Sequence, residues 1–204
     1  KQKNIQLLLT FSGAYLLSIT CLHLIPELFA HHPDHDIGLF ILYGFFLQIV
    51  LEYFSQGIEH GHINKSKILS NSVMISLCLH AFLEGFPLGG HLNIHTHEAL
   101  LSGIILHKIP VSIVLFSFFL QSRMKKTMIY FMLLLFASMT PLGVYTAGLF
   151  QVTADFHNEI IALVIGMFIY ISTTILFEST EGHRFSLQKI IFILVGLISG
   201  ILII

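Results

Sequence analysis

The chain has little charge, little cysteine and no tryptophan. Only 10% of its 204 residues are Asp, Glu, Lys or Arg, against about 25% in a typical soluble domain, so a water-soluble surface cannot be built from them. The near balance of 10 basic and 11 acidic residues excludes a nucleic-acid partner bound through net positive charge, and two cysteines exclude a disulfide framework. What remains is a chain that is 55% hydrophobic with a mean hydropathy of +0.85, which excludes intrinsic disorder and indicates a membrane protein.

Seven apolar stretches are each close to the length of about 20 residues that a helix needs to cross a bilayer. Because backbone groups in lipid must be satisfied within their own segment, these stretches predict helices, and the alternation of membrane-barrel strands is absent. The predicted fold class is an all-α membrane protein, a polytopic helical bundle that forms one domain over residues 1–204. The predicted spans are Ile5–Leu28, Ile37–Gly57, Ile68–Leu88, Glu98–Leu120, Thr127–Phe150, Glu159–Phe177 and Lys189–Ile204.

The basic residues lie on one side of this arrangement. Eight of the ten precede the first span or lie in the second, fourth and sixth connectors, a ninth is the first residue of the last span on the same side, and the other three connectors contain none. By the positive-inside rule, the visible N-terminus is expected in the cytoplasm and the C-terminus outside. The charge bias suits a bacterial inner membrane, and the alternative is another membrane that shares the rule. Since the chain begins without Met, we also expect a preceding helix, which makes eight in the full protein. The nine residues are Lys1, Lys3, Lys65, Lys67, Arg123, Lys125, Lys126, Arg184 and Lys189.

Histidine is abundant, with 13 residues, and seven of them fall in the predicted outer connectors. These connectors also hold acidic residues but neither Lys nor Arg. Imidazole and carboxylate groups bind divalent cations, so the pattern predicts an outer face that gathers metal. The alternative is that these are ordinary polar connector residues. The residues predicted for outer capture are His31, His32, His35, His91, His95 and His97.

Ionisable side chains within the predicted spans are costly in lipid and therefore mark function. His80 and Glu84 are four residues apart, so they share one helix face in the third span. His107 in the fourth span can supply a third metal ligand and leave one coordination position open. Three such ligands suit Zn²⁺ and are compatible with Fe²⁺, Mn²⁺ or Cd²⁺. The alternative is a buried polar cluster that joins two helices by hydrogen bonds.

These residues carry a resemblance to a family. The segment His80–Gly85 (His-Ala-Phe-Leu-Glu-Gly) resembles the His-Asn-x-Pro-Glu-Gly motif of the ZIP family of zinc and iron transporters. His107–Pro110 resembles the His-x-x-Pro-Glu-Gly motif on the next helix, and His23–Glu27 and Gly166–Tyr170 resemble shorter stretches of the second and seventh helices. The family has eight helices, so the visible spans would be its second to eighth. The resemblance implies uptake of a divalent metal by alternating access, with no catalytic residue and no cofactor.

Departures from the family pattern change the expected number of metal ions. Ala81 stands where the first motif has Asn, and Val111 and Ser112 stand where the second has Glu-Gly, so one bridging carboxylate is missing. We predict that the Lys108 ammonium takes the place of a second metal and pairs with Glu84, so that one ion binds. The alternative is that Lys108 disables transport and leaves a non-transporting metal sensor or scaffold.

Other polar residues in the spans are candidates for a pathway. His23 and Glu27 lie near the end of the first span, Glu52 lies toward the inner end of the second, and Thr140 lies in the fifth beside a predicted helix break at Pro141. Each is also explained as a satisfied polar residue.

The predicted function is uptake of one divalent ion, most of all Zn²⁺, by a protein that is not an enzyme. Its expected partners are the metal ion and the lipid bilayer, with a second copy of the chain as a further candidate. The alternatives are the sensor or scaffold and, less favoured, an intramembrane hydrolase with a zinc-bound water.

Overall fold

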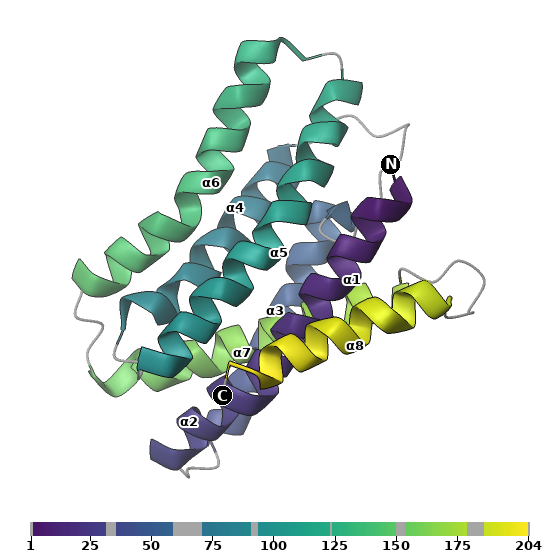
Figure 1. Ribbon diagram of the computed structural model, residues 1–204. Coiled ribbons are helices and arrows are strands. Elements are labelled where there is room, and N and C mark those ends of the chain that lie inside the picture. The colour runs from purple at the N-terminus through teal and green to yellow at the C-terminus, as the bar shows by residue number, and fades with distance from the viewer. Residues whose placement is uncertain are drawn as a thin grey trace.

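The computed structural model describes residues 2–31, 36–58, 71–90, 94–122, 124–149, 154–178 and 186–203, and within these ranges all regular structure is helical. Six helical units in these ranges are long and apolar enough to cross a membrane, and a further apolar helix, Leu187–Ile201, is shorter. The predicted all-α, polytopic bundle is thus confirmed, with helix ends within a few residues of the predicted spans. The helices are α1 (Gln2–Ile19), η1 (Thr20–Leu24), α2 (Ile25–His31), α3 (Asp36–Ser55), α4 (Asn71–Gly85), η3 (Phe86–Gly89), α5 (Ile94–Gln121), α6 (Lys126–Leu149), α7 (Ala154–Glu178) and α8 (Leu187–Ile201) (Figure 1).

Proline affects the helices differently from what the sequence indicated. In the first span, the π-helical turn η1 separates α1 from α2 just before Pro26, which lacks the N–H that a regular turn requires. In the fifth span, α6 continues unbroken through Pro141, so the predicted break there is wrong. The reason is packing: α6 lies closely on α4, with Gly143 against the Phe82 carbonyl and Gly85 against the Thr140 carbonyl, and this contact supports the helix on both sides of the proline.

Helices α3 and α7 pack closely through two glycines. A Cβ atom at Gly44 on α3 would overlap the backbone of Leu163, and a Cβ atom at Gly166 on α7 would overlap the carbonyl of Ile41. Small residues that allow two backbones to approach are a usual means of packing membrane helices. The contact fixes α3, which carries one side of the site described below.

Gly44→Ala is therefore expected to destabilise the protein by about 1–3 kcal/mol or more, because the added methyl group forces α3 away from α7. The matched control is Gly38→Ala on the same helix, since a Cβ atom there meets nothing within 4 Å. Thermal unfolding in detergent micelles measures both variants. Equal melting temperatures for the two variants would contradict the close contact.

Helix α8 packs along α1 in the same direction. Gly196 lies against Ala14, Gly200 lies one turn further against Ser18, and the Ser18 hydroxyl donates to the Leu197 carbonyl at 3.3 Å. The first and last helices are therefore parallel, and the two described ends of the chain lie at opposite ends of the bundle (Figure 1). This arrangement agrees with an odd number of spans.

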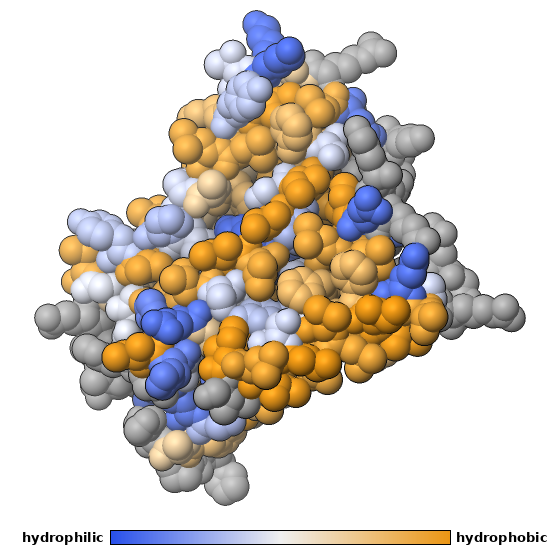
Figure 2. Space-filling view, viewed as in Figure 1, coloured by the Kyte–Doolittle hydropathy of each residue, from blue (hydrophilic) through white to orange (hydrophobic). Residues whose placement is uncertain are grey.

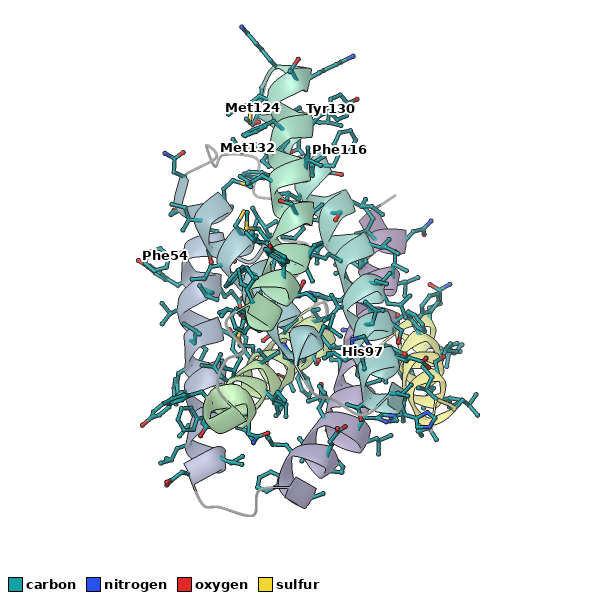
Figure 3. All side chains as sticks on the ribbon, turned by 90° about the vertical axis from the view of Figure 1, so that its left-hand side faces the viewer. Phe54, His97, Phe116, Met124, Tyr130 and Met132 are labelled. Carbon is teal, nitrogen blue, oxygen red and sulfur yellow. The ribbon has the colours of Figure 1, made fainter. Side chains whose placement is uncertain are left out.

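The core consists of two hydrophobic clusters stacked along the bundle, and His80, Glu84, His107 and Lys108 form a polar layer between them. Along α4 and η3 the change from one cluster to the other falls between Ala81 and Leu88, and on α5 it falls between Ile104 and Val111. Hydrophobic side chains also cover much of the visible flank (Figure 2), as expected for a surface in contact with lipid. His97 marks one end of α5, and Phe116 marks the region near the other (Figure 3). The polar layer therefore lies deep within the span.

Candidate metal site

His80 and Glu84 form the centre of the polar layer. One helical turn apart on α4, they lie with His80 Nε2 3.2 Å from Glu84 Oε2, and their side chains are only 3% and 1% exposed. A carboxylate held this deep in an apolar bundle requires positive charge or hydrogen-bond donors around it. The structure thus brings together the first two predicted ligands.

Gln48 on α3 contacts the other nitrogen of the same ring. Its Oε1 atom lies 3.2 Å from His80 Nδ1, and the Gln48 side chain is fully buried. Because an amide oxygen can only accept, Nδ1 carries the proton in this contact. In the neutral ring, Nε2 then presents its lone pair toward the Glu84 carboxylate. Two acceptors at this distance need a cation between them, either a proton or a metal ion.

Lys108 on α5 supplies positive charge on the opposite side of Glu84. Its ammonium donates to Glu84 Oε1 and to the Thr140 hydroxyl, and it lies 5.1 Å from the centre of the Phe136 ring. Thr140 Oγ1 on α6 in turn lies 3.0 Å from Glu84 Oε1 and 2.8 Å from the Ala81 carbonyl oxygen, so its single proton is shared between these two acceptors. The pairing of Lys108 with Glu84 is the one expected from the sequence. It engages one carboxylate oxygen and leaves the other directed at His80.

His107 lies beside this group on α5. Its ring centre is 6.3 Å from that of His80, the two rings are nearly perpendicular, and the side chain is 3% exposed. Among the described residues, no three His, Cys, Asp or Glu side chains are arranged as a metal-holding group in this conformation. The three predicted ligands are therefore neighbours, and whether they act together as ligands stays a prediction.

The other predicted pathway residues occupy different levels of the bundle. His23 lies within η1 and Glu27 in α2, toward the end of the first span that is remote from the chain start. Glu52 lies one turn beyond Gln48 on the same face of α3. Thr140 belongs to the group around Glu84.

Two of the six residues predicted for outer capture have described side chains. His95 and His97 lie in the first turn of α5, and His97 Nε2 is 3.3 Å from the Leu88 carbonyl, at the end of the bundle marked in Figure 3. His31 is the last residue of α2, but its side chain lies outside the described part of the structure. The same holds for the whole of His32, His35 and His91.

A cavity of about 830 Å³ opens between α5 and α6 beside the site. Its lining is mainly apolar, with residues such as Ile105, Ile109 and Val144, but Lys108 and Thr140 also contribute to it. The Lys108 ammonium is thus placed between a carboxylate on one side and an apolar space on the other.

Gln48 and Phe136 also belong to the site but are absent from the residues predicted for it from the sequence. Gln48 had a usable signal, because an uncharged amide in the middle of an apolar span needs a hydrogen-bond partner. Phe136 had none, since it is one of 19 phenylalanines and nothing in its local pattern distinguishes it.

Comparison with known proteins identifies one family. The family model described as ZIP zinc transporter matches residues 55–204, about three quarters of the chain. This segment includes His80, Glu84, His107 and Lys108, whereas Gln48 precedes it. No curated protein and no solved structure matches the chain.

Proposed function

The chain belongs to the ZIP zinc transporter family, whose members move divalent metals across membranes, and on that premise we propose that it takes up Zn²⁺ one ion at a time through the polar layer. In this proposal His80, Glu84 and His107 hold the ion. Lys108 occupies the position of a second ion. The protein is an integral membrane protein, and the proposal places it in a bacterial inner membrane.

The observation that carries the proposal is the composition of the polar layer. An imidazole and a carboxylate face each other at 3.2 Å, almost completely buried, with a second imidazole beside them. A purely structural link between helices does not need three ionisable ligands of this kind at one depth. Nitrogen and oxygen ligands in an otherwise apolar shell are the set that Zn²⁺ prefers.

A zinc ion can complete this group with a small movement of His107. Zinc bonded to two imidazole nitrogens at about 2.0 Å places the ring centres about 5–6 Å apart. The rings of His80 and His107 are at 6.3 Å, so a modest turn of His107 closes the shell. The ion would then lie between His80 Nε2 and Glu84 Oε2, where the two acceptors already need a cation.

The two hydrophobic clusters support alternating access. Each closes the bundle on one side of the polar layer, so an ion at His80 can exchange with only one side at a time if one cluster opens while the other stays packed. The confinement of basic residues to one side supports an orientation with the described N-terminal end in the cytoplasm, and inward movement is proposed from the family resemblance. His95 and His97 then lie on the outer side, and Glu52 lies on the inner route of release.

The test is metal flux into proteoliposomes, with the wild type compared with His80→Ala and His107→Ala. Both variants are expected to abolish zinc flux because each removes a ligand from the ion. The matched control is Ser102→Ala. Ser102 is on the same helix as His107 but outside the site, and the substitution removes a hydroxyl that contacts Tyr15. Competition with Fe²⁺, Mn²⁺ and Cd²⁺ measures selectivity. Zinc binding without flux in the wild type would instead identify a sensor or scaffold, and wild-type flux in both histidine variants would refute the site.

A further inference from the structure

Gln48 is held in position by α3 rather than by the helices that carry the three ligands. It lies one turn from Gly44, where α3 is fixed against α7, and its side chain is fully buried. A buried amide in an apolar bundle destabilises the folded protein unless it makes hydrogen bonds. Its contact with His80 therefore constrains both partners.

The direction of this hydrogen bond has a chemical consequence. The amide oxygen of Gln48 accepts from His80 Nδ1 at 3.2 Å, which selects the Nδ1–H form of the neutral ring. The lone pair is then on Nε2, the nitrogen that faces Glu84. Metal-binding histidines commonly owe both their tautomer and their ring orientation to such a partner on the second nitrogen.

We propose that Gln48 is a positioning residue that holds the proton of His80 on Nδ1 and the Nε2 atom directed at the metal position, and thereby sets the affinity of the site for Zn²⁺. This inference rests on the proposed function, because it needs His80 to be a metal ligand. Gln48 does not itself have to touch the ion. The residue acts through the orientation and tautomer of His80.

Replacement of Gln48 with an apolar side chain of similar size tests the inference. In Gln48→Met the acceptor is lost, so His80 can turn or shift its proton to Nε2, and zinc affinity is expected to fall about 10–100-fold. In Gln48→Glu an acceptor oxygen remains at the same reach, and affinity is expected to stay close to that of the wild type. Titration calorimetry of the full chain in detergent with ZnCl₂ measures the dissociation constant.

A matched control separates positioning from helix packing. The Ser76 hydroxyl also joins α4 to α3, by donating to the Leu51 carbonyl, but it does not contact His80 in that bond. Ser76→Ala is therefore expected to leave zinc affinity unchanged. In flux assays, Gln48→Met is expected to raise KM with little change in the maximal rate, because ground-state binding is what weakens.

The tautomer has its own spectroscopic readout. In ¹⁵N-histidine NMR of the metal-free protein, the His80 signal, assigned by its loss in His80→Ala, is expected to show a proton on Nδ1 in the wild type and a population that lacks this proton in Gln48→Met. Zinc binding at the site is the binding that exceeds that of Glu84→Gln. If His80→Ala abolishes it but Gln48→Met leaves both affinity and tautomer unchanged, this inference alone is wrong. If it survives His80→Ala, the proposed site and this inference fail together.

Discussion

Glu84→Gln is expected to abolish zinc flux and also to destabilise the folded protein. Flux is lost because the amide cannot replace the carboxylate ligand that faces His80. Stability is lost because Lys108 then has no anionic partner at this contact, and breaking a buried ion pair costs about 3–5 kcal/mol. Flux into proteoliposomes and thermal unfolding measure the two effects separately.

A second substitution separates the two roles of Glu84. In Glu84→Gln combined with Lys108→Met, both charges are gone, and the flexible methionine can fill the space beside Phe136. Replacing a buried ion pair with well-packed neutral groups is often neutral or stabilising. The double variant is therefore expected to regain stability but not flux. Recovery of flux together with stability would show that Glu84 only balances Lys108 and is not a ligand.

The sequence was sufficient to predict the helical bundle because lipid leaves few choices. Long apolar stretches must be helical there, so composition alone determines the fold class. The close pairing of His80 with Glu84 was equally predictable, since a spacing of four residues places both on one helix face. Contact between Lys108 and Glu84 followed from the need to neutralise two charges in adjacent spans.

Contacts between distant helices could not be derived in the same way. Which face of α3 meets α4 depends on how α3 crosses α7 at Gly44 and Gly166, and a glycine in an apolar span does not reveal its partner. The position of Gln48 opposite His80 follows from that crossing. At Pro141 the local sequence predicted wrongly. A proline within a span predicted a helix break, and tertiary packing of α6 on α4 prevents it.

Lys108→Glu is expected to change the number of metal ions in the site from one to two. In the wild type, the ammonium contacts Glu84 and Thr140, and it fills the position where a second cation would share the carboxylate. A glutamate at the same place brings two carboxylates together, and like charges in a buried site are stable only with a cation or proton between them. A second divalent ion supplies that charge and restores the bridging carboxylate that the sequence lacks at Val111.

Charge reversal and charge removal must be compared to interpret this count. Lys108→Gln removes the ammonium without adding an anionic ligand, so it is expected to keep one ion per chain. Equilibrium dialysis with elemental analysis gives the number of bound ions, and subtracting the number bound by Glu84→Gln removes ions held elsewhere, such as at the outer histidines. Two site-dependent ions in the wild type would contradict the role of Lys108. One ion in the wild type, in Lys108→Glu and in Lys108→Gln would mean that the ammonium neutralises Glu84 without occupying a metal position. The space that the ammonium vacates would then have no affinity for a second cation.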